Sequence, residues 1–105
     1  MKYHIYVTNE LSNIENDVKN YFLSKHSDSN EVSKLDFIAV VIKNDGGCEL
    51  HSVGQVIGMS DDLFILKWLK KSIRKYINCK LIKKYNVGMY GPMNIDETPL
   101  GLFVI

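Results

Sequence analysis

The chain has 105 residues, of which 46% are hydrophobic and 24% are charged, and its formal net charge is +1. This length and composition are typical of a folded domain, so we expect residues 1–105 to form one α+β domain. No apolar run is long enough to span a membrane, and the N-terminus lacks the apolar segment of a secretory signal. The two cysteines, Cys48 and Cys79, are too few for a disulfide framework. We therefore expect a cytoplasmic protein whose cysteines are free thiols.

The first two elements follow from hydrophobic periodicity. Residues 2–8 alternate between polar and apolar side chains, which predicts a strand. Ser12 and Glu15 have the spacing of a capping box, and apolar residues then recur at helical intervals from Ile14 and Val18 onward. This pattern predicts a helix from about residue 12 to residue 25. Residues 27–34 are almost entirely polar and predict a loop.

The middle of the chain predicts a β-hairpin. Residues 37–42 are apolar without interruption, which is typical of an interior strand covered on both faces. The residues that follow, Asn44, Asp45, Gly46 and Gly47, favour a tight turn into a strand over residues 48–57. Gly54 lies within that strand and indicates a bulge or a close approach of another segment.

Residues 60–78 predict a second helix. Ser60 is a suitable N-cap, and Asp61 and Asp62 would lie at the positive end of the helix. At 100° per residue, the apolar side chains occupy one half of the helical wheel and basic side chains the other. The apolar half contains Ile65, Leu66, Trp68, Leu69, Ile73, Tyr76 and Ile77, and the basic half contains Lys67, Lys70, Lys71, Arg74 and Lys75.

The C-terminal third predicts a strand over residues 80–87, a long loop over residues 88–99 and a final apolar segment from Leu100 to Ile105. The final segment should pair as a strand or pack against a partner, because an exposed apolar terminus would aggregate. The resulting order is β-α-β-β-α-β with an extra C-terminal strand. We expect a two-layer α+β sandwich, with a ferredoxin-like arrangement as the leading interpretation.

Charge is distributed unevenly along the chain. Residues 1–62 contain five lysines and ten acidic residues, whereas residues 63–105 contain eight basic and two acidic residues. Such a dipolar distribution predicts an attraction for an anionic partner, although an amphipathic helix also needs charged residues on its solvated face. The candidate partner-binding residues are Lys67, Lys70, Lys71, Arg74, Lys75, Lys83 and Lys84.

Motifs for catalysis, cofactor binding and metal binding are weak. Cys48 and His51 have a spacing seen in metal sites, but in a strand they would face opposite sides, and no second ligand pair lies nearby. Neither cysteine lies in a recognisable nucleophile motif, although a pairing with His4 or His51 stays open. Gly58 and Ser60 precede the predicted helix, but the adjacent aspartates would repel a phosphate. We expect no enzyme activity, no cofactor and no metal.

Three functional hypotheses remain. The first is a non-catalytic binding protein that docks on a protein with an acidic surface, as an inhibitor, an immunity protein or an anti-defence protein would. The second is a nucleic-acid-binding module that uses the same basic residues, although the isoelectric point of about 7.7 is low for that class. The third is a self-assembling module, such as a homodimer formed through Leu100 to Ile105. None of these predicts contact with a membrane.

Overall fold

The chain folds around one curled, mixed β-sheet. The computed structural model describes residues 1–26, 31–44, 47–71, 73, 75–77, 86–98 and 102–103. Its elements, in order, are β1 (Tyr3–Thr8), α1 (Leu11–Lys19), β2 (Phe22–Ser24), β3 (Phe37–Asn44), β4 (Gly47–Met59), β5 (Leu63–Lys70), β6 (Lys75–Ile77), β7 (Gly88–Met93) and the 3-10 helix η1 (Ile95–Glu97). The predicted two-layer α+β sandwich with two helices is therefore wrong. The described part of the chain is mostly β, with a sheet curled into a half-barrel and a single α-helix.

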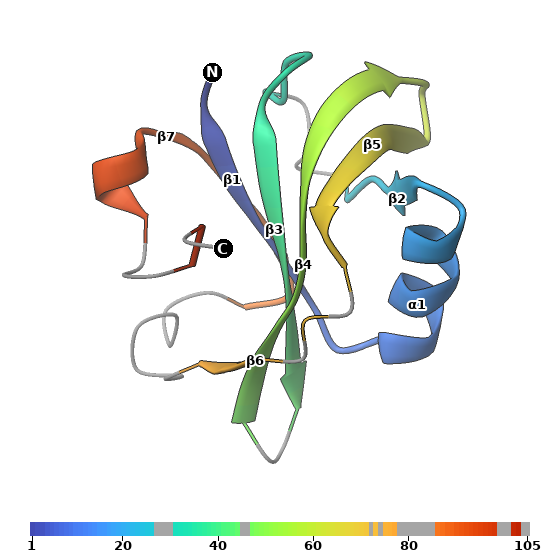
Figure 1. Cartoon of the computed structure of the whole chain (residues 1–105), viewed down its shortest axis with the longest axis vertical. Coiled ribbons are helices and arrows are strands. Elements are labelled where there is room, and N and C mark those ends of the chain that lie inside the picture. Colours follow the sequence, from blue (N-terminus) through green and yellow to red (C-terminus); the bar gives the residue numbers. More distant parts are fainter. Residues whose placement is uncertain are drawn as a thin grey trace.

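The strand order is β2-β5-β4-β3-β1-β7, and β6 pairs separately with β4. β1 runs parallel to β3, whereas the other described strand pairs are antiparallel. A parallel pair needs a crossover connection, which here contains α1 and β2. Figure 1 shows α1 on one side of the curled sheet, beside β2 and β5, and η1 on the other side.

The central strand β3 is buried on both faces, as the sequence predicted. Val40 belongs to one core, which we call the helix-side core because it includes Ile14 and Val18 of α1. Val41 belongs to the other core, which we call the tail-side core because it includes Leu102 near the end of the chain. Alternate side chains of a strand point to opposite faces, so an unbroken apolar run is what a strand between two cores requires.

The long strand β4 bends at irregularities in its register. Its pairing with β3 shifts where His51 is the extra residue, and its pairing with β5 shifts beside Gly54 and again beside Ile57. Bulges of this kind bend a strand and increase its twist. As a result, the first part of β4 pairs with β6 and the later part pairs with β5. Of the two alternatives predicted at Gly54, the close backbone approach is confirmed, since a Cβ atom there would lie 3.3 Å from the Lys67 carbonyl oxygen, and 2.8 Å from Trp68 Cε3. The register shift beside Gly54 has its extra residue, Leu69, in β5.

The predicted second helix over residues 60–78 is wrong, because this segment forms β5 and β6. Ser60 does not cap a helix; it closes the turn between β4 and β5. Its Oγ accepts a hydrogen bond from the Leu63 backbone N–H at 3.2 Å, and its own N–H donates to the Leu63 carbonyl at 2.9 Å. A serine at the N-cap of a helix also accepts a hydrogen bond from the backbone N–H three residues later. The Ser60 pattern is therefore typical both of a helix start and of this turn.

The helix α1 is shorter than predicted and begins one residue earlier. Its N-cap is Glu10, so the predicted capping box at Ser12 is wrong. The helix ends at Lys19, and Tyr21 takes a left-handed backbone conformation with a φ of 62°. The chain then enters β2, which pairs with β5. Residues 22–24 thus form a strand of the sheet, although their helical spacing had predicted that they belong to the helix.

The C-terminal third differs from the prediction in two respects. Residues 88–93 form β7 and residues 95–97 form η1, where a loop was expected. The expected strand from Leu100 to Ile105 is described only at Leu102 and Phe103, which form a turn. Leu102 is 2% exposed in the tail-side core, and the Phe103 ring meets the Tyr3 ring edge-on with centroids 4.8 Å apart. Part of the predicted loop, residues 27–30, lies outside the described residues. The same is true of residues 80–85 of the strand predicted over residues 80–87.

Two expectations about cellular context also bear on the fold. The expectation of free thiols is wrong at Cys48, which is disulfide-bonded and buried in the tail-side core. Cys79, the second of the two cysteines, lies outside the described residues. Within the described ranges, no helix has both the length and the apolar character that a membrane crossing requires.

We expect Gly54→Ala to lower the free energy of unfolding by about 1–3 kcal/mol, because the added methyl group must displace the rigid Trp68 ring. Gly58→Ala is the matched control on the same strand. A Cβ atom at Gly58 would lie 3.5 Å from Ile65 Cδ1, an ordinary contact, so the change should stay below about 1 kcal/mol. Urea-induced unfolding measures both, and equal losses would contradict the close packing at Gly54.

Candidate functional site

The predicted basic residues lie on strands and not on a helical face. Lys67 and Lys70 belong to β5, Lys75 belongs to β6, and Lys71 follows β5 directly. All four side chains are exposed. The remaining candidates, Arg74, Lys83 and Lys84, lie outside the described residues.

Three of these lysines share one face of the sheet. Lys67 lies opposite Gln55, Lys70 opposite Val53 and Lys75 opposite Leu50. Val53 and Leu50 belong to the tail-side core, and residues directly opposite on neighbouring strands share a face. The three partners span six residues of β4, and the five steps between the first and the last correspond to about 17 Å at the rise of an extended strand. We call Lys67, Lys70 and Lys75 the lysine row.

Lys71 is separated from the lysine row. Its ammonium group lies 4.9 Å from the centroid of the exposed Tyr21 ring, between α1 and β2. This is a cation–π contact with a partner on the chain itself. The structure therefore divides the predicted basic surface, bringing Lys67, Lys70 and Lys75 to one face and turning Lys71 toward the helix side.

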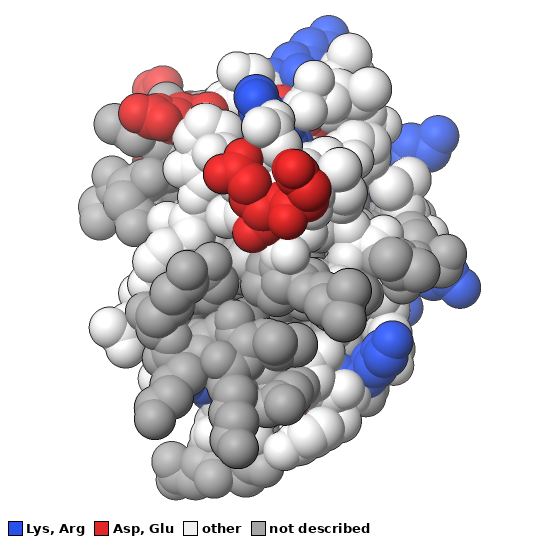
Figure 2. Space-filling view, turned by 90° about the vertical axis from the view of Figure 1, so that its left-hand side faces the viewer, with Lys and Arg blue, Asp and Glu red and all other residues white. Residues whose placement is uncertain are grey.

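The charges of the lysine row are not neutralised by any described carboxylate; the ion pair found among the described residues joins His4 and Asp36 instead. Acidic side chains gather elsewhere. Figure 2 shows them at the centre of the face that carries η1, whose Asp96 and Glu97 are exposed, while the basic side chains visible there lie at its margins. Asp96 and Glu97 are the two acidic residues of the mainly basic segment 63–105, so this acidic patch does not follow from the uneven charge distribution along the chain.

The aromatic residues near the lysine row differ in exposure. Trp68, from the apolar half of the predicted helix, packs against the helix-side core. Tyr76 comes from the same apolar half, for which burial is expected, but it is 68% exposed on β6, so that expectation is wrong. Its ring lies over Gly47, where a Cβ atom would be 2.7 Å from Tyr76 Cε2.

A second polar surface, which the sequence analysis missed, is a cleft of about 550 Å³. It lies where β1 ends, between α1 and the segment that follows β2. The side chains lining it are mostly hydrogen-bonding groups, with a few apolar ones. They are Tyr6, Thr8, Asn9, Glu10, Asn13, Ile14, Asn16, Asp17, Ser24, Lys25, His26 and Val87.

Tyr6 forms the inner wall of this cleft. Its hydroxyl donates a 2.7 Å hydrogen bond to the Ser24 carbonyl, and its ring stacks on His26 with centroids 4.3 Å apart. Burial, together with the negative charges of Asp17 and Glu10, raises the pKa of Tyr6 to about 12. The phenol therefore stays protonated at neutral pH and acts as a hydrogen-bond donor.

Local hydrogen bonds hold both carboxylates of the cleft in place. Asp17 Oδ2 accepts from the Ser24 backbone N–H at 3.0 Å and from the Ser24 hydroxyl at 2.9 Å. Glu10 Oε2 accepts from the Asn13 side-chain amide. The sequence signal for this arrangement is the spacing of Glu10, Asn13 and Asp17, which puts them on one face of a helix directly after a strand.

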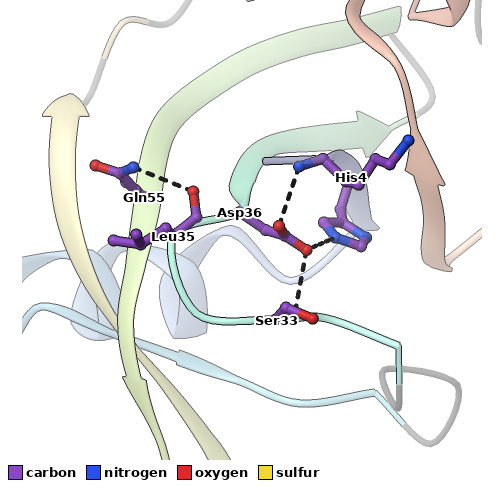
Figure 3. A network of polar contacts seen from close by, with 6 residues as sticks. His4, Ser33, Leu35, Asp36 and Gln55 are labelled. Atoms are coloured by element: carbon purple, nitrogen blue, oxygen red, sulfur yellow. Dashed lines mark hydrogen bonds and ion pairs between the residues drawn. The ribbon is translucent and has the colours of Figure 1, made fainter.

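A buried His4–Asp36 pair joins β1 to the segment before β3 (Figure 3). His4 Nε2 lies 2.8 Å from Asp36 Oδ2, which also accepts from the Ser33 backbone N–H, and Asp36 Oδ1 accepts from the Lys2 backbone N–H. Burial would raise the pKa of Asp36, but the hydrogen bonds from His4, Ser33 and Lys2 lower it below its ordinary value. Gly91 of β7 packs directly against the His4 ring. The pair therefore ties three segments of the chain together.

The candidate nucleophiles and ligands singled out in the sequence do not converge. Cys48 is disulfide-bonded, so it does not offer a thiolate to His4 or His51. His51 is completely buried, and its Nδ1 lies 2.7 Å from the Ser52 hydroxyl. Across the described ranges, no three histidine, cysteine, aspartate or glutamate side chains are grouped closely enough to hold a metal ion.

Comparisons of the chain with protein-family models, with curated proteins and with solved structures found no match. The function of the protein is therefore inferred from the lysine row and the cleft themselves.

We expect Asp36→Asn to lower the free energy of unfolding near pH 7 by about 2–3 kcal/mol, because charge-assisted hydrogen bonds to a buried carboxylate are lost. The lowered pKa means that ionised Asp36 stabilises the fold above its ordinary pKa, and that this contribution disappears as the pH falls through the folded-state value. The difference between wild type and Asp36→Asn should therefore shrink between about pH 5 and about pH 2.

Urea-induced unfolding across this pH range tests the prediction, with Asp61→Asn in the exposed β4–β5 turn as the control. A difference that is independent of pH, or one that the control reproduces, would contradict the assignment to Asp36.

Proposed function

We propose that the protein is a non-catalytic binding protein that docks on an acidic surface of another protein, as an inhibitor, an immunity protein or an anti-defence protein would. The observation that carries this proposal is the lysine row. Lys67, Lys70 and Lys75 share one sheet face, are exposed and meet no described counter-charge. Unpaired cations in a row repel one another, and an acidic partner surface would relieve that repulsion.

The size and rigidity of the surface support docking. Stable protein complexes bury about 800 Å² on each partner, and a row about 17 Å long can form the centre of such an area. The lysines project from strands that are paired with β4, so the backbone beneath them is already ordered before a partner arrives. Complementary charge of this kind mainly accelerates association and selects among partners.

Nucleic-acid binding by the same lysines is the alternative. Tyr76 is exposed on β6, but it follows Lys75 directly in a strand, so its ring faces away from the lysine row and offers that row no stacking platform. The isoelectric point of about 7.7 also favours a protein partner. Self-assembly through Leu100 to Ile105 is less supported, because Leu102 is buried against the sheet of its own chain.

The cellular location is part of the proposal and has an argument on each side. Two cysteines are too few for the disulfide framework of a small secreted domain, which supports a cytoplasmic protein. The disulfide at Cys48 favours an oxidising compartment, because cytosolic thiols are usually kept reduced. A thiol titration of protein purified from its native host under alkylating conditions separates the two locations.

We expect reversal of the lysine row, by Lys67→Glu, Lys70→Glu and Lys75→Glu together, to slow association with the partner at low salt by about tenfold or more. The partner is first captured from the native host with the wild-type protein as bait and then purified. Association rates are measured by surface plasmon resonance at several salt concentrations.

The matched control reverses Lys2, Lys19 and Lys34, which are exposed and do not belong to β5, β6 or the lysine row. An association rate that is unchanged by reversal of the lysine row, or reduced equally by the control, would disprove docking at this surface. Binding of nonspecific DNA or RNA, with about 0.9 unit of logarithmic salt slope per phosphate contacted, would instead support the alternative.

A further inference from the structure

The geometry of the cleft at the end of β1 points to a second site, which goes beyond the proposed docking function: we propose that it binds a linear aliphatic polyamine. Its volume of about 550 Å³ is within the range of small-molecule sites. Its charge is opposite to that of the lysine row, so the two surfaces would recognise different chemistry.

The cleft lies at a position in the sheet where ligands commonly bind. β1 is flanked by the parallel strand β3 and the antiparallel strand β7, and the cleft opens at its carboxyl end, where Thr8 and Asn9 lie. In open sheets that contain parallel strands, the connections diverge at such ends and leave a crevice. Here α1 forms one wall, and Val87, just before β7, forms part of another.

The hydrogen-bonding groups of the cleft are mainly oxygen acceptors. Glu10 and Asp17 contribute carboxylates, and each has one oxygen that accepts no hydrogen bond from a described residue. Carboxamides from Asn9, Asn13 and Asn16 add further acceptors. A ligand that fits this wall must carry several N–H donors, and a positive charge would complement its two carboxylates.

The one lysine of the cleft does not neutralise these carboxylates. The ammonium group of Lys25 lies 5.2 Å from the centroid of the Phe64 ring. No described lysine or arginine forms an ion pair with Glu10 or Asp17. The positive end of α1 lies closest to Glu10, whose own charge offsets it, so the negative potential extends along the helix face.

The spacing of the two carboxylates selects a linear ligand with separated charges. Glu10 and Asp17 are seven residues apart, which corresponds to about 10 Å along a helix axis. Asn13 lies between them on the same face. An extended triamine such as spermidine carries its terminal ammonium groups across a comparable span, with a secondary amine between them.

Apolar groups along the cleft suit the methylene segments of such a ligand. Ile14 is buried beneath the polar wall, the Tyr6 ring lies at the base, and Val87 is half exposed at the rim. A ligand made only of hydrogen-bonding groups, such as a compact sugar, would leave these side chains without apolar contact. An alternation of amines and methylenes satisfies both parts of the surface.

Titration of isotope-labelled protein with spermidine, followed by amide NMR spectra, tests the proposal on the wild-type chain. We expect shifts concentrated at residues 8–17 and 24–26. n-Butylamine, which has a single ammonium group, should bind about tenfold more weakly, because one of the two charge contacts is lost. Shifts spread over the whole surface, or equal affinity for both amines, would overturn the proposal.

The matched variants are Glu10→Gln, which removes one carboxylate of the cleft, and Glu31→Gln, which removes an exposed carboxylate outside the cleft. Calorimetry should show spermidine affinity reduced about three- to tenfold by Glu10→Gln and unchanged by Glu31→Gln. Equal losses of spermidine affinity in the two variants would mean that spermidine is attracted nonspecifically by negative charge, and would disprove the site. Reversal of the lysine row should leave spermidine affinity intact, which keeps this test separate from the docking test.

Discussion

The structure depends on the burial of β3 on both of its faces. A strand with apolar side chains on alternate faces needs a cover on each side, and the chain supplies α1 for one and the segment around Leu102 for the other. The flanking strands β1 and β4 then complete the hydrogen-bonding ladders of β3. This arrangement positions both the cleft and the lysine row. The cleft lies beside the end of β1, and the lysine row lies on the strands that pair with β4.

A register shift between β4 and β5 explains why the lysine row lies on one face of the sheet. The chain from β5 to β6 follows β4 along one edge, although the register shifts beside Gly54 and Ile57. Because of the shift beside Gly54, where Leu69 is the extra residue of β5, Lys67 and Lys70 come to one face, and pairing with Leu50 puts Lys75 on the same face. A regular strand would have put Lys67 and Lys70 on opposite faces. The irregularities of the ladder therefore create the surface that the proposal uses.

Sequence patterns predicted the strands at either side of the β3–β4 turn, the N-terminal strand and the position of α1, because each has a local signal. The second helix was wrong because apolar side chains spaced to fill one half of a helical wheel over residues 65–77 can also occur in strands, and periodicity alone did not separate the two. Pairing with β4 and β2 decided between the two, and that pairing is not visible locally. The cleft was missed because it forms between α1 and residues 24–26, whose contact depends on the crossover. The Asn94-x-x-Glu97 pattern of η1 was a further local signal, and it did not enter the prediction of a loop over residues 88–99.

The pairing of β1 has a consequence for synthesis of the chain. Tyr3 pairs with Phe37 on one side and with Met93 on the other. Strand β1 therefore cannot complete its pairing until residues 88–93 have been synthesised. While the ribosome still holds residues 88–93, one edge of β1 has no strand to bond with. The antiparallel β3–β4–β5 meander, whose contacts are local, can form earlier. The sheet is therefore completed only once residues 88–93 have left the ribosome, and a nascent chain exposes the β1 edge to chaperones until then.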